Sequence, residues 1–340
     1  EPKNMTVQVN VYPETIFSDE NSTVSVYVSY DALPIAEAQV DITASIGSLS
    51  SQIETTDSYG QAFFVYQAPT IYEETVAVLN ITVSKDGYSD VTLQSTITIE
   101  PKVLTIEVEA HPETAISEST INVSVHVTFN GQPVSGADVQ VTSSFGNFSG
   151  RSITDSNGIC TFTFTAPPVN QETNVTIFAN ASKIGYVSSS SSTTITLKPG
   201  ILELGADINP IVANSGETVT LTVHVKCSDI GVQNALVTLV SDFGNLSQYT
   251  NSSGLCVFSF AAPQVTSQTT FTLVITASKD GYLDASGTFY LDVVPAAPQT
   301  GFPLTTFMII AIIILIIIVI IALLFKFKVI EVSWEKEAET

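Results

Sequence analysis

Positive charge is scarce in this sequence. Of its 340 residues only 11 are Lys or Arg, against 33 Asp or Glu, which leaves a formal net charge of −22 at pH 7. Nucleic-acid binding requires clustered cations that neutralise phosphates, so this balance excludes that class of function. The acidity instead favours solubility and repulsion from anionic surfaces.

Cysteine and histidine are equally rare, with three of each. Cys160, Cys227 and Cys256 lack a metal-binding spacing such as Cys-x2-Cys. They fit inward-facing strand positions, so we expect buried small hydrophobic residues, although Cys227 and Cys256 could lie on neighbouring strands and form a disulfide. The histidines have no second ligand type at a fixed spacing, and no nucleophile elbow accompanies the many Ser and Asp residues. We therefore expect no enzyme, no catalytic or metal-binding residues, no cofactor and no small-molecule substrate.

Only one long apolar run occurs, and it extends from Leu304 to Phe325 without a charge, a Gly or a Pro. About 20 apolar residues in a helix cross the roughly 30 Å hydrocarbon core of a bilayer. A buried helix of a soluble domain is rarely apolar on every side for so long. The run predicts one transmembrane helix over residues 304–325, with the lipid bilayer as a partner.

The charges that flank this run predict its orientation. Lys326 and Lys328 follow it directly, whereas no Lys or Arg lies between Lys279 and the run. By the positive-inside rule, residues 326–340 form a cytoplasmic tail and the preceding chain lies outside the cell. No signal peptide precedes the first strand pattern, so we expect Glu1 to be a mature start or the start of the membrane-proximal part of a longer protein.

An internal repeat of just under 100 residues organises the rest of the chain. Pro13, Pro112 and Pro210 recur at spacings of 99 and 98 residues. Further positions recur in the same order: Gly60, Gly158 and Gly254; Ala68-Pro69, Ala166-Pro167 and Ala262-Pro263; Tyr88, Tyr186 and Tyr282. We predict three domains over residues 1–100, 101–199 and 200–295, and a linker over residues 296–303 before the apolar run.

Within each repeat the apolar residues alternate with polar ones, which is the period of a β-strand and not of a helix. About seven such strands per repeat, separated by Gly, Pro and Asn turns, are typical of a two-sheet β-sandwich. The predicted fold is all-β, with three tandem sandwiches before one C-terminal helix. Three strands show the alternation most clearly: Val24, Val26 and Val28; Ile121, Val123, Val125 and Val127; Val219, Leu221, Val223 and Val225.

The second repeat carries a more specific pattern. Gly131-Gln-Pro-Val-Ser-Gly-Ala-Asp-Val139, followed by Thr154-Asp-Ser-Asn-Gly158 and an aromatic strand, resembles the group 1 bacterial Ig-like repeats of invasin and intimin. The first and third repeats keep less of this motif, and the Gly-Tyr ending also resembles carboxypeptidase-regulatory-like sandwiches. The resemblance implies Ig-like domains that act as extracellular spacers or adhesive modules. Their combination with one apolar span, in place of that family's membrane barrel, points to a single-membrane envelope, such as that of an archaeon or a Gram-positive bacterium.

N-glycosylation is the chemical modification that the sequence supports best. Several of the sequons fall on the polar phase of a strand, and Asn147 and Asn245 fall in the same predicted loop of two repeats. The alternative is that these residues belong to a Ser- and Thr-rich sheet surface. Nine Asn-x-Ser/Thr sequons begin at Asn4, Asn21, Asn80, Asn122, Asn147, Asn174, Asn180, Asn245 and Asn251.

A calcium ion at a domain junction is a weaker hypothesis. Glu54, Asp57, Asp86 and Glu100 could meet near one end of the first domain, and carboxylate oxygens suit Ca²⁺. The third repeat replaces Asp57 by Asn251, and no EF-hand pattern is present, so the expected cofactor is none.

Two loops are candidates for contact with a partner. They contain Phe145 and Phe148 in the second repeat and Phe243 and Leu246 in the third. The alternative is that Phe145 and Phe243 close the ends of their sandwiches.

These features predict a glycosylated, single-pass membrane protein with Ig-like repeats at the cell surface. A sandwich of this size is about 35–40 Å long, so three would reach roughly 100 Å from the membrane. The expected role is a structural spacer or an adhesive stalk. Two alternatives remain: a receptor or adhesin that binds glycans or other envelope proteins through domain-end loops, or the anchor portion of a larger envelope-lattice or exported protein.

Overall fold

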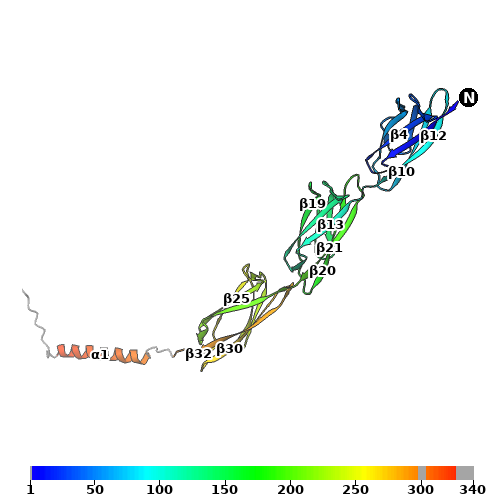
Figure 1. Cartoon of the computed structure of the whole chain (residues 1–340). Coiled ribbons are helices and arrows are strands. Elements are labelled where there is room, and N and C mark those ends of the chain that lie inside the picture. Colours follow the sequence, from blue (N-terminus) through cyan, green and yellow to red (C-terminus); the bar gives the residue numbers. More distant parts are fainter. Residues whose placement is uncertain (1, 298–303, 327–340) are drawn as a thin grey trace, which may run out of the picture. The chain divides into compact units, whose positions relative to one another are not determined.

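The computed structural model describes residues 2–297 and 304–326 (Figure 1). It contains three Ig-like β-sandwiches and one C-terminal apolar helix, which confirms the predicted fold class. The chain divides into two compact units: Glu1–Glu203 with Ser278–Ala285, and Leu204–Ala277 with Ser286–Thr340. The predicted domain boundaries stay a prediction. The cytoplasmic tail beyond residue 326 and most of the linker lie outside the described residues.

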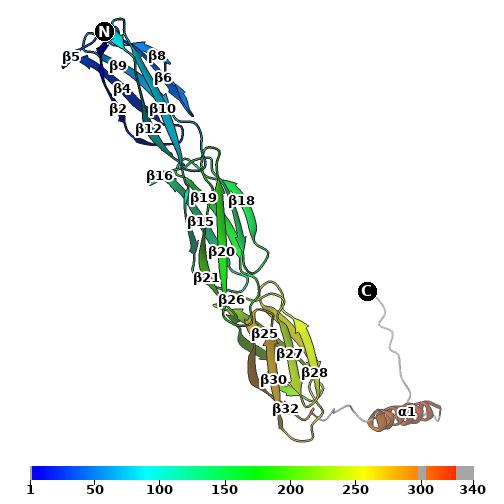
Figure 2. The same ribbon diagram turned by 90° about the vertical axis from the view of Figure 1, so that its right-hand side faces the viewer.

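The first unit begins with a sandwich whose two sheets face each other across one core (Figure 2). One sheet has the order β2-β4-β9-β7, with β5 beside β4, and the other has the order β3-β12-β10-β6-β8. The strands are β2 (Thr6–Tyr12), β3 (Thr15–Phe17), β4 (Asn21–Tyr30), β5 (Leu33–Pro34), β6 (Gln39–Ala44), β7 (Ser48–Leu49), β8 (Ile53–Thr55), β9 (Gln61–Gln67), β10 (Thr75–Ser84) and β12 (Val91–Glu100). A short parallel pair joins β1 (Lys3–Asn4) to β11 (Tyr88–Ser89).

The second sandwich, also in the first unit, repeats this plan with its own core. Its sheets have the orders β13-β15-β16, with β19 also paired with β15, and β14-β21-β20-β17-β18. The strands are β13 (Thr105–His111), β14 (Thr114–Ile116), β15 (Thr120–Phe129), β16 (Gln132–Pro133), β17 (Asp138–Ser143), β18 (Ser149–Ile153), β19 (Ile159–Thr165), β20 (Thr173–Ser182) and β21 (Ser189–Lys198). The first unit also contains β22 (Gly200–Ile201) paired in parallel with β31 (Tyr282–Leu283).

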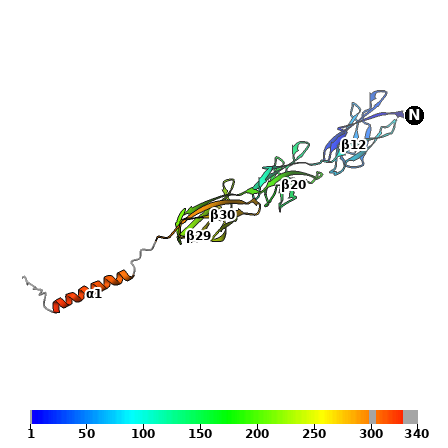
Figure 3. The ribbon, with the colours of Figure 1, turned by 90° about the horizontal axis from the view of Figure 1, so that it is seen from below.

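The third sandwich and the helix make up most of the second unit (Figure 3). Its sheets have the orders β23-β25-β26, with β29 beside β25, and β24-β32-β30-β27-β28. The strands are β23 (Glu203–Asn209), β24 (Val212–Asn214), β25 (Thr218–Cys227), β26 (Ile230–Gly231), β27 (Leu236–Ser241), β28 (Gly244–Tyr249), β29 (Leu255–Ala261), β30 (Thr269–Ser278) and β32 (Ala285–Val294). The helix α1 extends over Leu304–Lys326.

The alternation seen in the sequence explains these sheets. On the central strand β4, the side chains of Val24, Val26 and Val28 are fully buried, whereas Thr23, Ser25 and Tyr27 between them are exposed or half-buried. The equivalent valines and leucines of β15 and β25 are equally buried. Burying one such side chain stabilises the fold by roughly 1.5–3 kcal/mol, so each repeat holds enough apolar surface for a separate core.

A buried threonine joins the two sheets of every repeat. Thr154 Oγ1 accepts a hydrogen bond from the amide of Ala137 at 2.9 Å and donates one to the carbonyl of Val134 at 2.7 Å. Thr56 and Thr250 make the same pair of bonds in the first and third repeats. These hydroxyls satisfy backbone groups that are buried outside the regular ladders. Nothing in the polar-apolar alternation predicts them.

The segment that precedes the aromatic strand differs between repeats. In the first it is divided, so that β7 pairs with β9 in one sheet and β8 with β6 in the other. In the third it forms one strand, β28, in which Asn245 pairs with Val240. The expectation that Asn245 lies in a loop like Asn147 is therefore wrong. A tight turn that pairs Ser241 with Gly244 extends the third-repeat hairpin back through Asn245.

Candidate surface sites

All nine sequon asparagines are exposed, and so are the other seven asparagines of the chain. Exposure therefore permits glycosylation of the sequon asparagines, but it does not distinguish them from the other asparagines. Asn80, Asn122, Asn174 and Asn180 lie on outward positions of β10, β15 and β20, as the alternation predicts. N-glycosylation at the nine sites stays a prediction.

The sequons differ in what their side chains contact. Asn251 Oδ1 accepts hydrogen bonds from the amides of Ser253 and Leu255 and so closes a turn. Asp57 and Asp155 perform this task at the same position of the first two repeats. The asparagine at 251 thus has a structural function, independent of any sugar.

The loop residues proposed for partner contact fall into two groups. Phe148 and Phe243 are partly buried: the ring of Phe148 lies 5.1 Å from that of Phe164, and Phe243 contacts two rings of its own sandwich. Phe145 and Leu246 are 43% and 39% exposed. The first group packs against its own sandwich, and the second presents more apolar surface to solvent.

The structure does not assemble the four carboxylates considered for calcium. Asp86 lies in the turn before β11, whereas Glu100 ends β12 at the far end of that ten-residue strand. The Oδ1 of Asp57 is taken up by its own turn. Within residues 2–297 and 304–326, no group of three His, Cys, Asp or Glu side chains could hold a metal ion.

The three cysteines are free thiols and buried. Burial raises the pKa of the Cys160 and Cys256 thiols to about 11, with the nearby Asp155 carboxylate adding to the effect at Cys160. Strands β25 and β29 do pair, but Cys256 lies opposite Val223, so Cys227 is not its register partner. The thiols belong to the cores.

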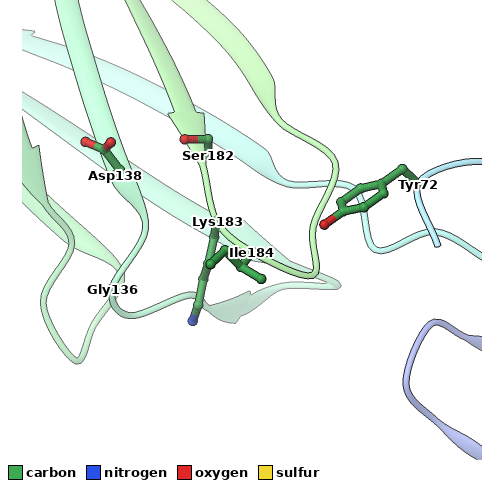
Figure 4. A pocket seen from close by; sticks show the side chains of 6 residues that line it. All are labelled: Tyr72, Gly136, Asp138, Ser182, Lys183 and Ile184. Carbon is green, nitrogen blue, oxygen red and sulfur yellow. The ribbon is translucent and has the colours of Figure 1, made fainter. Parts of the chain in front are cut away.

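One surface hollow lies beside the second sandwich and is shown in Figure 4. Tyr72 of the first sandwich faces it from one side, and Lys183 and Ile184 line it from the other. Its charged groups are occupied, because Asp138 forms an ion pair with Arg151, and Lys183 donates to the carbonyl of Ser135 at 2.6 Å. The Arg151 guanidinium holds the pKa of the Asp138 carboxyl below its ordinary value. The charged side chains that line the hollow are therefore paired within the chain.

The outer face of the first sandwich has a different character. On β2, β4 and β9 no residue is charged. Tyr12 on β2 and Phe63 and Val65 on β9 point outward, with exposures of 77%, 55% and 44%. In register, Tyr12 and Val65 flank Thr23 of β4, so the three form one row across the sheet.

A second and a third row complete this surface, which we call the β2-β4-β9 face. Asn10 and Phe63 flank Ser25, and the amides of Gln8 and Gln61 flank Tyr27. Neighbouring rows lie about 7 Å apart, because alternate residues of a strand share one face at roughly 3.4 Å per residue. Aromatic rings and amide groups are thus distributed over a sheet surface without charged residues.

The other two sandwiches lack this surface at the same repeat positions. Where the first has Gln8 and Asn10, the second has Glu107 and Glu109. The positions of Tyr12, Phe63 and Val65 are occupied by His111, Thr161 and Thr163 in the second repeat, and by Asn209, Val257 and Ser259 in the third. Sequence reasoning missed the β2-β4-β9 face, although aromatic residues on the polar phase of two paired strands were a signal for it.

No protein-family model matches the chain, and no curated protein matches it. Solved structures similar to it include the D0–D1 domain of intimin, at 19% identity and a TM-score of 0.25, covering 56% of this chain and 99% of that one. The Yersinia pseudotuberculosis adhesin InvE is similar at 20% identity and a TM-score of 0.29, covering 57% and 60%. A 1.5-MDa bacterial ice-binding adhesin is similar at 14% identity and a TM-score of 0.32, covering 87% and 100%. These similarities concern the fold alone.

Proposed function

We propose that this protein is a single-pass membrane protein that displays three Ig-like sandwiches on the cell surface, where they act as an adhesive or spacer module. The observation that carries the proposal is the helix α1. From Phe307 to Leu323 all of its side chains are exposed, and no described part of the chain covers them. A helix of 23 residues is about 34 Å long, enough to cross a roughly 30 Å hydrocarbon core.

The amino-acid side chains of α1 explain why a bilayer is the partner that fits. The helix is apolar on every side, so a groove on another protein would cover only part of it. Its first turn has no acidic residue, and its last turn carries Lys326. A lysine at the cytoplasmic end agrees with the positive-inside rule, which places the sandwiches outside.

Carbonate extraction and protease shaving of intact cells test this proposal together. We expect the full chain, labelled by an epitope at Thr340, to stay in the membrane at alkaline pH. Protease added outside should remove the sandwiches and leave the epitope protected. Release by carbonate, or loss of the epitope to external protease, would contradict insertion or orientation respectively.

A variant of the helix gives the matched control. Leu315→Arg places a charge at the middle of the apolar stretch, which costs about 2.5–3.5 kcal/mol of insertion free energy, whereas Leu315→Val keeps the stretch apolar. The arginine variant should be extracted more readily, and the valine variant should behave like the parent. Equal extraction of both would mean that α1 does not insert.

A further inference from the structure

We propose that the β2-β4-β9 face of the first sandwich binds a neutral polysaccharide. The inference deepens the adhesive role proposed above by assigning it to one face and one class of ligand. It does not depend on membrane insertion, because the face lies entirely within the first sandwich.

The shape of the face favours an extended ligand. Its three rows follow the paired strands β2, β4 and β9, which lie side by side in one sheet. An open sheet surface buries little of a small molecule but can follow several units of a linear polymer. Tyr12, Tyr59 and Phe63 stand 77%, 74% and 55% exposed on it or at its end.

The side chains of the face match the chemistry of a sugar ring. An aromatic ring can cover the apolar C–H face of a pyranose, and tyrosine adds a polar edge at low entropic cost. The amides of Gln8, Asn10 and Gln61 both donate and accept hydrogen bonds, as sugar hydroxyl groups require. Exposed aromatic residues gathered in this way on a soluble domain usually mark an interaction site.

Charge decides between a neutral ligand and the alternatives. The chain carries a net charge of −22, which repels polyanions such as acidic polysaccharides. The face itself has no cation that could attract one, since β2, β4 and β9 contain no charged residue. Self-association through this face would bring two acidic sandwiches together, and like charges within a Debye length of about 8 Å repel each other. A neutral polymer meets none of these penalties.

A sugar attached to the sequon at Asn21 could also occupy the β2-β4-β9 face. Asn21 begins β4 and lies opposite Gln67, one row beyond Tyr12, Thr23 and Val65. A sugar attached there would reach the same aromatic surface from within the molecule. The test therefore compares protein with and without this sugar.

Affinity electrophoresis in native gels tests the proposal on the full chain in detergent, with hydroxyethylcellulose, dextran, laminarin or galactomannan in the gel and alginate as the acidic control. We expect at least one neutral polysaccharide to retard the protein and alginate not to do so. Phe63→Thr and Asn10→Glu should weaken that binding roughly tenfold or more, the fold-change that corresponds to 1.4 kcal/mol. Both variants should fold, because the second sandwich carries Thr161 and Glu109 at these positions. Tyr290→Ala, at a 62% exposed tyrosine on β32, is the matched control and should bind like the parent.

Four results from these gels and from light scattering would overturn the proposal. They are no retardation by any neutral polysaccharide, retardation by alginate alone, equal retardation of the parent and Phe63→Thr, and concentration-dependent association in light scattering that Phe63→Thr abolishes, since the face would then pair two copies. A sugar attached at Asn21 could also occupy the face. To test this, the same gels are run with protein from a glycosylating host and with protein from a non-glycosylating host. Binding by both forms supports an external ligand, whereas binding by the bare form alone assigns the face to the sugar at Asn21 and overturns the proposal.

Discussion

Lys102 Nζ lies 3.6 Å from Asp19 Oδ2, which joins the start of the second repeat to a turn of the first. Asp19 adopts a left-handed backbone with φ of 64°. The equivalent residue of the second repeat is Glu118, with φ of 67°, and its carboxylate lies 2.5 Å from Lys279 Nζ. The third repeat has Gly216 there, with φ of 80°. This left-handed position would suit glycine. In the first two repeats it holds an acidic residue instead, and in both a lysine of the following repeat pairs with that residue.

Replacement of Asp19 by Gly should separate these two effects. Glycine removes a left-handed penalty of about 1 kcal/mol. It also removes a partly exposed ion pair worth about 0–1 kcal/mol and the hydrogen bond that Thr70 Oγ1 donates to Asp19 Oδ1, worth about 0.5–1.5 kcal/mol, so the thermal midpoint of the first sandwich should stay level or fall slightly. Lys102, whose side chain is 17% exposed in the ion pair, should then be cleaved by trypsin faster, by roughly severalfold.

Asp19→Asn is the matched control for this experiment. Asparagine tolerates the left-handed region but carries no charge, so it should accelerate cleavage at Lys102 without raising the midpoint. Unchanged trypsin cleavage in both variants would show that the ion pair does not hold this segment. In the wild-type protein, the protection of Lys102 from trypsin should diminish as salt is added, because salt screens exposed ion pairs.

Thr154→Val should destabilise the second sandwich. Valine matches the shape of threonine but leaves the amide of Ala137 and the carbonyl of Val134 without partners, at about 1–3 kcal/mol for each buried group. Denaturant unfolding, with hydrogen exchange of peptides from β17, measures the loss. Thr154→Ser keeps the hydroxyl and should retain most of the stability. The exposed Thr161→Val is the control, and equal stability of both valine variants would refute the bridging role.

The sequence predicted the sheets well because each repeat buries one face of every long strand. Alternation alone placed Val24, Val123 and Leu221 in the cores, and all three are fully buried. It also placed Cys160 and Cys256 inward, as the structure has them. Period-2 patterning is a strong signal wherever one side of a strand excludes water.

The surface sites were harder to predict, because they depend on register between strands that are distant in sequence. Tyr12 and Val65 share a row only because both strands pair with Thr23. Glu100 was wrongly grouped with Asp86, since reading along the chain does not show that a ten-residue strand separates them. Hairpin length is set by turn geometry, which is why the strand position of Asn245 was missed.

The buried thiols should be unreactive in the folded protein. Because burial raises the pKa of Cys160 and Cys256 to about 11, thiolate is scarce at pH 8, and the side chains are also inaccessible. A thiol-specific chromogenic reagent should report no thiol at pH 8 in buffer and three in denaturant. Raising the pH toward 11 should accelerate thiol labelling only to the extent that the folded protein opens and lets the reagent reach the thiols. Rapid labelling of native protein, or fewer than three thiols after unfolding, would contradict this assignment.

Intact mass spectrometry of the protein from its native membrane tests the predicted glycosylation, and Asn180 is the most informative site. Asn180 and Phe178 lie two residues apart on β20 and line the same shallow hollow, with Phe178 49% exposed. An attached sugar could cover that ring, so a sugar here would also reduce exposed apolar surface.

The expected mass exceeds the 36.2 kDa of the chain in sugar-sized steps. Asn180→Gln should remove one step and should also lower the thermal midpoint slightly, because Phe178 loses its cover. Asn157→Gln changes an equally exposed asparagine outside any sequon and should leave the mass increment intact. An unmodified mass would show that the exposed asparagines serve only as polar sheet surface, and the aromatic ring of Phe178 would then require another partner.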